Sequence, residues 1–280
     1  MTMTAEPTLS KYMRRWGARS VPFSGPCNGG LFQTDATRQA QDLLQQSAAL
    51  RSVMLLSGGN GVGKSTVASD WIGHLEPKVY MPLRITQSSL SPSGLLATLV
   101  GKLGRQPSNQ RSPNLRRIEE AVASLGRVTP VLVLDDAQDY TASALEEVRL
   151  LLGMNLSPVP VFSLVLIADN YLIDSLRLQA RRALYSRIAV SYQLTPLLPE
   201  QVEPFLVHGL KHVGIDRQCF DPNASAMITS ASDGVPRTIN LLARNAWIEA
   251  SKQKADSILP EHVQAALTLV PLARDKIARP

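Results

Sequence analysis

A glycine-rich segment constrains the fold of this chain more than any other feature. It reads GGNGVGKST over residues 58–66 and fits the pattern G-x-x-x-x-G-K-[ST] in full. An apolar run, 53–57, precedes it, and a pattern of helical spacing, 64–74, follows it. In such a loop, successive backbone N–H groups point inward at a helix N-terminus, where they can surround phosphate oxygens. The sequence therefore predicts a strand, a phosphate-binding loop and a helix, in that order.

The residues of this loop have separate expected tasks. Lys64 is expected to reach the β- and γ-phosphates of a nucleotide, and the hydroxyl of Ser65 is expected to ligate Mg²⁺. The alternative is a glycine-rich turn that binds nothing, and the strand and helix in register with the loop argue against it. The other expected nucleotide-binding residues are Gly58, Gly59, Asn60, Gly61, Val62, Gly63 and Thr66.

A second apolar run, 131–134, ends in two carboxylates, Asp135 and Asp136. The apolar residues indicate a buried strand, and ligands of open α/β sheets bind at the carboxyl ends of the strands. Asp135 is placed to hold Mg²⁺, directly or through water, and Asp136 is placed to polarise the attacking water. Standing alone, the two residues would be explained by a solvated acidic pair. Their position on a later strand than the loop favours the nucleotide site.

Strand-like and helical patterns alternate through the middle of the chain. The strand-like runs are 53–57, 79–83, 131–135, 161–168 and 188–194. The helical patterns are 35–48, 64–74, 93–103, 115–125 and 142–152, the first with Asp35 as its expected N-cap. This alternation predicts an α/β nucleotide-binding domain over 35–195, with a parallel sheet that helices cover on both faces.

The two ends of the chain have other patterns. After Pro196 the strand signals stop, and helical spacing predicts a small all-helical domain over 196–272, followed by a tail, 273–280. Residues 1–34 show little periodicity, are rich in Gly, Pro and Arg, and predict an extended basic lead-in. The helices expected in the C-terminal domain are 199–213, 222–232, 236–251 and 260–269.

Composition limits the compartment and the partners. The longest apolar stretch, 159–168, is much shorter than the about 20 residues that a membrane span needs. The N-terminus is polar and lacks the apolar segment of a secretion signal, and the two cysteines, Cys27 and Cys219, cannot build a disulfide framework. We therefore expect a cytoplasmic protein that does not contact a membrane. The net charge of +6 and the pI near 9.5 suggest a polyanionic partner, or a charge that serves solubility alone.

Together these motifs resemble those of the AAA+ ATPases, a P-loop family, and within it the branch of ExeA and of transposition ATPases of the TnsC and MuB type. The similar segments read VPF at 21–23, DDAQ at 135–138, LEEVRLL at 145–151, LVLIADNYL at 164–172, SRI at 186–188 and SDGVPRTIN at 232–240. The resemblance implies a P-loop α/β fold followed by a helical lid, with ATP and Mg²⁺ as cofactors. This branch places its first segment beside the adenine, which implies that Pro22 and Phe23 contact the base.

The resemblance also implies residues that complete a hydrolytic site. Arg187 matches the arginine finger, which neutralises charge on the γ-phosphate of a neighbouring subunit, and Arg237 matches sensor 2, which reaches the same phosphates from the lid. Sensor 1 falls on Asp169, with Asn170 as the neighbouring candidate. Asp136 stands where the family has the longer Glu, so hydrolysis is expected to be slow unless the backbone compensates. Taken one by one, the arginines could equally belong to a solvated basic face or cap a helix.

What the ATPase would drive depends on which relatives it follows. ExeA is a secretion ATPase, and its branch implies a membrane segment and a cell-wall-binding domain after the ATPase. Because this chain ends at Pro280, directly after the helical patterns, we expect the transposition type. Such a regulator forms rings or filaments on double-stranded DNA with ATP and recruits a transposase to the target, together with a target-selection adaptor. The alternatives are a secretion or envelope ATPase, and an ATP-locked assembly scaffold with little turnover.

One basic segment is the expected DNA contact. Residues 102–117 include five cations and no acidic residue, and 104–114, rich in Ser, Pro, Asn and Gln, predicts a loop that projects from the sheet. Repeated around an oligomer, this loop would contact the phosphate backbone without reading the bases. A solvated basic face is the alternative. The five cations are Lys102, Arg105, Arg111, Arg116 and Arg117.

Overall fold

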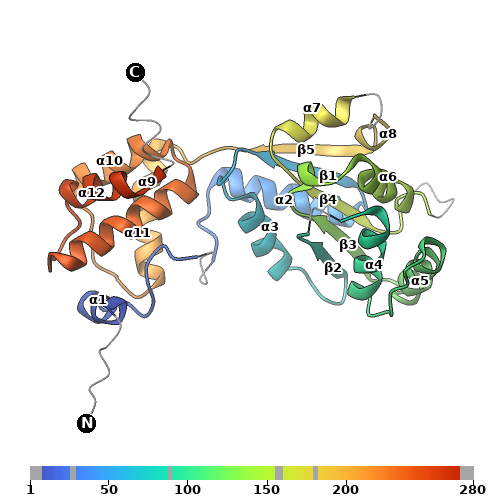
Figure 1. The fold of residues 1–280 in the computed structure, drawn as a ribbon, viewed down its shortest axis with the longest axis horizontal. Coiled ribbons are helices and arrows are strands. Elements are labelled where there is room, and N and C mark those ends of the chain that lie inside the picture. The colour runs from blue at the N-terminus through green and yellow to red at the C-terminus, as the bar shows by residue number, and fades with distance from the viewer. Residues whose placement is uncertain (1–7, 26–29, 88–89, 155–159, 179–181, 272–280) are drawn as a thin grey trace, which may run out of the picture. The chain divides into compact units, whose positions relative to one another are not determined.

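The structure, a computed structural model, describes residues 8–25, 30–87, 90–154, 160–178 and 182–271. The chain divides into two compact units (Figure 1). The α/β unit comprises residues 33–60 and 64–195, and the helical unit comprises residues 1–32, 61–63 and 196–280. The tail expected at 273–280 lies outside the described residues, as does Cys27.

A five-stranded parallel sheet with the order β2-β3-β4-β1-β5 forms the centre of the α/β unit. β1, β3 and β4 are buried along their whole length, whereas the side chains of β5 are alternately half-buried and exposed along most of the strand. Central strands of a parallel sheet are covered on both faces, and for that reason they are continuous apolar runs in the sequence. The strands are β1 (Val53–Gly58), β2 (Tyr80–Ile85), β3 (Thr129–Leu134), β4 (Ser163–Ile167) and β5 (Ile188–Leu194).

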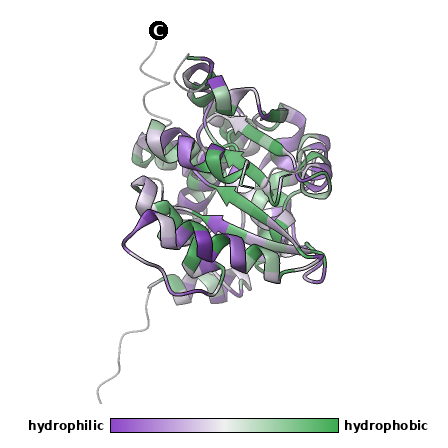
Figure 2. Cartoon of the chain, turned by 90° about the vertical axis from the view of Figure 1, so that its right-hand side faces the viewer, coloured by the Kyte–Doolittle hydropathy of each residue, from purple (hydrophilic) through white to green (hydrophobic). Residues whose placement is uncertain are grey.

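Helices pack against this sheet, and much of the sheet's interior is hydrophobic, green in Figure 2. Alternate strand residues such as Leu55, Leu132 and Leu166 form one core cluster with Leu99 of α4 and Val148 of α6. The short helices α7 and α8 have no counterpart among the predicted helices. The helices of this unit are α2 (Asp35–Ala49), α3 (Lys64–Gly73), α4 (Pro92–Lys102), α5 (Arg111–Ser124), α6 (Ala142–Leu151), α7 (Tyr171–Arg177) and α8 (Arg182–Tyr185), with a 3-10 turn, η1 (Ala137–Asp139).

The N-cap of α2 is Thr34 rather than the expected Asp35. Thr34 has an extended backbone, and its hydroxyl oxygen accepts the backbone N–H of Thr37 at 3.1 Å, which satisfies one of the free N–H groups of the first turn. Asp35 lies in that first turn, where a negative charge interacts favourably with the helix dipole. The start of the helix was therefore predicted one residue too late.

The segment expected as a projecting loop is shorter and more tightly held than its composition suggests. α5 begins at Arg111, so the last residues of the expected loop are helical. Asn114 is fully buried, and its side chain makes two hydrogen bonds to the backbone of Ser108, at 2.7 and 2.8 Å. These bonds tie the start of the helix to the residues before it, which explains why a segment rich in polar residues forms a compact turn.

The helical unit contains α1 (Thr8–Trp16), α9 (Pro199–His212), α10 (Pro222–Ser232), α11 (Pro236–Lys252) and α12 (Pro260–Leu269). Each of the last four begins with a proline, whose missing N–H costs nothing in the first turn of a helix. None of the helices in the described part of the chain is long and apolar enough to cross a membrane.

Helix α1 corrects the expectation of an extended lead-in over residues 1–34. Its Trp16 is buried in the core of the helical unit, and the indole N–H donates to the hydroxyl of Ser251 at 2.9 Å. Arg15 also forms an ion pair with Asp256 at 2.9 Å. Tyr12 and Met13 pack against the same core, so the apolar face of α1 has helical spacing, a short signal that the sequence analysis missed.

Candidate nucleotide-binding site

The glycine-rich loop joins the end of β1 to the start of α3. Gly61 and Gly63 have positive φ angles of 84° and 104°, which side-chain-bearing residues adopt only with strain. Lys64 is 8% exposed, and its ammonium group donates to the carbonyl oxygens of Gly58 and Gly59 at 2.9 and 3.0 Å. Its positive charge is thus held against the loop whose sequence predicts a phosphate site.

The two motifs of the sequence meet in one hydrogen bond. The Ser65 hydroxyl donates to Oδ1 of Asp135 at 2.9 Å, and the backbone N–H of Asp136 donates to the same oxygen at 3.2 Å. Asp135 is buried, and it follows β3, whose carboxyl end lies at the same edge of the parallel sheet as the loop after β1. The fold therefore brings together residues that are 70 apart in the sequence.

This pair has the chemistry that Mg²⁺ requires. A hydroxyl and a carboxylate are hard oxygen donors, and a magnesium ion in a nucleotide site needs only one or two protein ligands because phosphates and water supply the others. Within the described ranges, no group of three or more His, Cys, Asp and Glu residues could hold a metal. Ser65 and Asp135 therefore fit an ion that is held jointly with a bound nucleotide.

Sequence reasoning missed Arg84, at the end of β2. Its guanidinium donates to Oδ2 of Asp135 at 2.6 Å and to the hydroxyl of Ser69 at 2.5 Å. The predicted strand ended one residue before it, whereas β2 continues to Ile85. Nothing in the sequence pattern marks this arginine, because its partner, Asp135, follows the neighbouring strand β3.

Asp136, the expected catalytic carboxylate, is exposed and has a left-handed backbone with φ 49° and ψ 49°. The side-chain amide of Gln138 donates to Oδ1 of Asp136 at 3.4 Å, and its oxygen accepts the backbone N–H of Asp169 at 3.1 Å. A non-glycine residue in this backbone region is uncommon and often lies at a functional position. Gln138 thus connects Asp136 to the end of β4.

Both candidates for sensor 1 have local partners. Oδ1 of Asp169 accepts the backbone N–H of Tyr171 at 3.0 Å, which satisfies a donor in the first turn of α7. The side-chain oxygen of Asn170 accepts from Gln193 of β5 at 3.4 Å. The choice between Asp169 and Asn170 stays a prediction.

A buried phenol lies close to the acidic pair. Tyr140 is 2% exposed, and its hydroxyl has no hydrogen-bond partner among the residues that the structure describes. Burial, with smaller contributions from the negative charges of Asp135 and Asp136, raises the pKa of Tyr140 to about 12. The phenol is therefore neutral in the physiological range.

Arg187 lies at the amino-terminal end of the parallel strands, whereas the glycine-rich loop lies at their carboxyl-terminal end. It precedes β5, whose first residue, Ile188, pairs with Val53, whereas Gly58 at the loop pairs with Leu194. At about 3.3 Å per residue, these pairings separate the two ends by about 20 Å, which is longer than an arginine side chain. Arg187 therefore does not reach the loop of its own chain.

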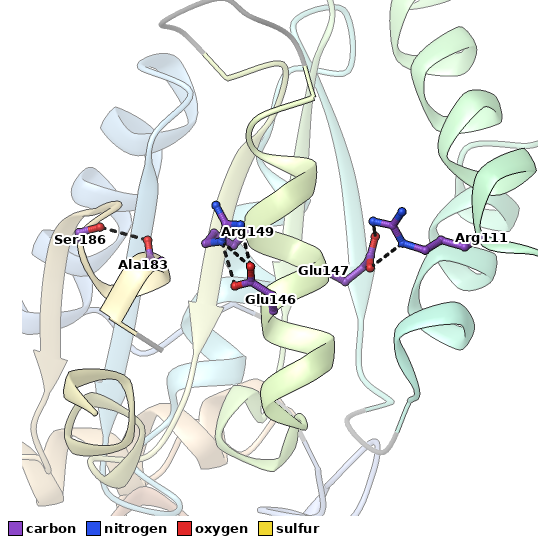
Figure 3. Close-up of polar contacts among 6 residues, drawn as sticks. All are labelled: Arg111, Glu146, Glu147, Arg149, Ala183 and Ser186. Carbon is purple, nitrogen blue, oxygen red and sulfur yellow. Dashed lines mark hydrogen bonds and ion pairs between the residues drawn. The ribbon is translucent and has the colours of Figure 1, made fainter. Parts of the chain in front are cut away.

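The neighbouring charges on α6 are paired with each other (Figure 3). The guanidinium of Arg149 binds Glu146 at 2.6 to 2.9 Å. This hydrogen bonding, with smaller contributions from the charges of Arg149 and Arg187, lowers the pKa of Glu146. Arg187 is exposed, and its charge acts on Glu146 only at a distance.

The remaining predicted contacts lie in the helical unit. Arg237, in the first turn of α11, is exposed, and its backbone N–H donates to the carbonyl of Gly61, a residue that belongs to this unit. Phe23 is 9% exposed, and its ring packs edge-on against Phe220 at 6.2 Å. Pro22 is also buried. The contact of Pro22 and Phe23 with adenine stays a prediction.

The basic segment differs from its expectation. Arg111 binds Glu147 of α6 with two hydrogen bonds of 3.0 and 2.9 Å (Figure 3), and Glu147 is buried. Arg116 is paired with Glu120, and Arg117 has a buried nitrogen without a hydrogen-bond partner in the described chain. The segment has no acidic residue of its own, but the fold and the next helical turn supply acidic partners. In the list of predicted DNA contacts, the cations that are exposed and form no ion pair with described residues are Lys102 and Arg105.

Comparison with known proteins gives three kinds of match. Residues 48–176 match the family described as AAA domain. The chain is 28% identical over 276 residues to the general secretion pathway protein A of Aeromonas hydrophila. The aligned region covers 95% of this chain and 49% of that protein. The chain thus spans about half the length of this relative.

Solved structures with the same fold are more distant in sequence. They include the ORC2 protein of Aeropyrum pernix, with a TM-score of 0.68 and 16% identity over 91% of this chain and 71% of that one. The Drosophila ORC bound to DNA has a TM-score of 0.63 and 18% identity over 100% of this chain and 70% of that one. The RuvB Holliday junction branch migration motor of Thermotoga maritima has a TM-score of 0.58 and 16% identity over 87% and 72%.

These matches confirm the predicted fold class. They also support homology to the ExeA type of secretion protein, whereas they do not confirm the TnsC and MuB branch. The parallel sheet, the glycine-rich loop after β1 and the acidic residues after β3 agree with these matches. Residues 48–176 thus correspond to an AAA domain, and the chain has the P-loop fold of the AAA+ ATPases.

Proposed function

We propose that this chain binds and hydrolyses ATP with Mg²⁺ and that it serves protein secretion, in a role similar to that of general secretion pathway protein A. The observation that carries the proposal is the hydrogen bond of 2.9 Å between Ser65 and Asp135, which joins the phosphate loop to the acidic strand end. The similarity to the secretion protein supports the second part, because it extends over 95% of this chain and includes the helical unit.

The residues of the site have distinct tasks in this proposal. Lys64 binds the β- and γ-phosphates, and Ser65 and Asp135 hold Mg²⁺, which supplies positive charge to the phosphate oxygens. Asp136 accepts a proton from the water that attacks the γ-phosphate. Because Asp136 is exposed and is not buried in the sheet edge, it is accessible to that water.

The shorter carboxylate of Asp136 raises the question of how fast this step is. The left-handed backbone at Asp136 and the contact with Gln138 both act on the direction of the carboxylate. A positioned carboxylate contributes to hydrolysis only at the correct distance from water, so turnover measures whether this backbone compensates for the missing methylene. Binding of ATP without turnover would favour the ATP-locked scaffold.

The position of Arg187 supports assembly into a homo-oligomer. Because the sheet separates Arg187 from its own loop, this arginine is available only to the nucleotide of a neighbouring subunit. Arg187 also lines a hollow of about 310 Å³ together with Leu50, whose side chain is 73% exposed.

Complementation between two inactive variants tests the proposal. Lys64→Ala removes nucleotide binding but keeps the arginine finger, whereas Arg187→Ala keeps the loop but removes the finger. A 1:1 mixture is expected to regain about a quarter of the wild-type ATPase rate, because half of the sites have an intact loop and half of those face an intact finger. The rate of phosphate release measures the result.

A second mixture is the matched control. Lys64→Ala mixed with Asp136→Asn leaves every subunit without a complete site of its own, so this mixture is expected to remain inactive. If both mixtures regain the same ATPase rate, Arg187 does not act as an arginine finger. The same conclusion follows if the first mixture stays inactive while the wild type is active. A wild-type protein that binds no ATP contradicts the proposed function as a whole.

The similarity to general secretion pathway protein A favours secretion over DNA transposition. One support for transposition was the basic segment, and two of its cations, Arg111 and Arg116, are engaged with acidic partners. Double-stranded DNA, a transposase and an adaptor therefore have less support as partners than secretion components do.

A further inference from the structure

The geometry points to Arg84 as a positioning residue that holds the carboxylate of Asp135 and sets the Mg²⁺ concentration that the site requires. This inference rests on the proposed function, because it assumes a nucleotide bound with Mg²⁺ at the glycine-rich loop. It adds a residue that neither the loop nor the acidic motif contains.

Both oxygens of the Asp135 carboxylate have partners. Oδ1 accepts from the Ser65 hydroxyl and from the backbone N–H of Asp136, at 2.9 and 3.2 Å. Oδ2 accepts from the guanidinium of Arg84 at 2.6 Å. Asp135 is therefore neutralised by a cation of the protein itself, and its orientation is fixed from three directions.

Arg84 is itself anchored on a second element. Another nitrogen of its guanidinium donates to the hydroxyl of Ser69, which in turn donates to the carbonyl oxygen of Ser65 at 2.6 Å. Ser69 lies one helical turn after Ser65, so both serines lie on the same face of α3. The planar fork of an arginine can bind a carboxylate and a hydroxyl at once, which the single ammonium of a lysine does less well.

The positive charge of Arg84 has a cost for metal binding. Mg²⁺ and the guanidinium would share one carboxylate, and their charges of the same sign repel each other. A buried carboxylate without a cation is unstable, so Arg84 also stabilises the fold when no metal neutralises Asp135. Arg84 thus weakens Mg²⁺ binding while it keeps the carboxylate in place.

An ordinary structural ion pair predicts the opposite result. If Arg84 only maintained the fold, its removal would disorder Asp135 and would weaken Mg²⁺ binding or leave it unchanged. Under the present inference, removal of the charge strengthens Mg²⁺ binding. The direction of the change therefore separates the two explanations.

The experiment is a titration of Mg²⁺ at a fixed concentration of a fluorescent ADP analogue, in buffers that control the free metal. We expect Arg84→Met to lower the half-saturating Mg²⁺ concentration on the order of tenfold, from the loss of the repulsion alone. Arg84→Lys keeps the charge and is expected to stay close to the wild type. Arg84→Gln, which is neutral but can still donate to Asp135, is expected to follow Arg84→Met and replaces it if that variant does not fold.

Thermal unfolding gives a second readout that does not depend on nucleotide turnover. In EDTA, Arg84→Met is expected to unfold at a lower temperature than the wild type, and Mg²⁺ with ADP is expected to narrow this difference. Arg38→Met is the control, because Arg38 is paired with Asp35 on the surface of α2 and its loss should change neither measurement.

The outcomes of the titration are distinct. A half-saturating Mg²⁺ concentration that is unchanged or higher in both neutral variants overturns the inference. A failure of the proposed function has another signature, since the wild type would then bind no ADP analogue, or Lys64→Ala would bind it as well as the wild type does.

Discussion

The glycine-rich loop and the basic segment were both singled out by their sequences, and the structure treats them differently. In the loop, each residue with an expected task has neighbours that suit it: Lys64 lies against the loop carbonyls, and Ser65 bonds to Asp135. In the basic segment, Arg111 and Arg116 are bound to glutamates, and α5 begins where a loop was expected.

The difference lies in what each pattern specifies. The loop pattern fixes spacing, and spacing in a strand–loop–helix unit determines geometry through the backbone alone. The basic segment fixes only composition, and the availability of a charge depends on which residues the fold places beside it. Glu147 belongs to another helix, so no reading of the segment itself could find this partner.

The largest expected effect tests whether the glycine-rich loop binds nucleotide. Lys64→Ala removes the charge that meets two phosphates, and the loss of two charge-assisted hydrogen bonds should weaken ATP binding on the order of a thousandfold. Calorimetric titration with ATP measures the affinity. Lys78→Ala, at an exposed lysine of the same unit, is the control. Equal affinities for the two variants would remove the loop from the nucleotide site.

A smaller effect tests whether Arg111 of the basic segment stabilises the fold. Arg111→Met leaves the buried Glu147 without its partner, which should lower the free energy of unfolding by about 3 kcal/mol, near the lower end for a buried ion pair because the guanidinium is half exposed. Arg105→Met, at an exposed residue, should change it by less than about 0.5 kcal/mol. Urea denaturation compares the two variants, and similar midpoints would show that Arg111 is not a structural residue.

The smallest expected effect concerns DNA. We expect filter binding at physiological salt to show no ATP-dependent complex with double-stranded DNA, and the exchange of Lys102 and Arg105 for alanine to change nothing. The DNA interpretation predicts a complex that weakens steeply with salt. In that case each lost phosphate contact lowers the slope of log K against log salt by about 0.9, and a slope reduced by this amount would restore the segment as a DNA contact.

Most of the fold was predictable because it follows from local patterns. The buried central strands β1, β3 and β4 are continuous apolar runs, and the last four helices begin at prolines that interrupt the chain visibly. Helix α1 was missed because its apolar pattern, Tyr12, Met13 and Trp16, spans little more than one helical turn. The start of α5 was missed because the buried Asn114 stabilises a segment whose composition favours a loop.

The candidate site shows the same division. The sequence by itself determined Lys64, Ser65 and Asp135, because a fixed spacing after an apolar strand leaves the backbone few alternatives. Only the tertiary structure decided that Arg84 lies against Asp135 and that Arg187 lies at the end of the strands opposite the glycine-rich loop. Both depend on how separate strands pair, and pairing joins residues whose separation along the chain carries no signal. The order of the residues determines local geometry, whereas tertiary packing determines which charged side chains pair.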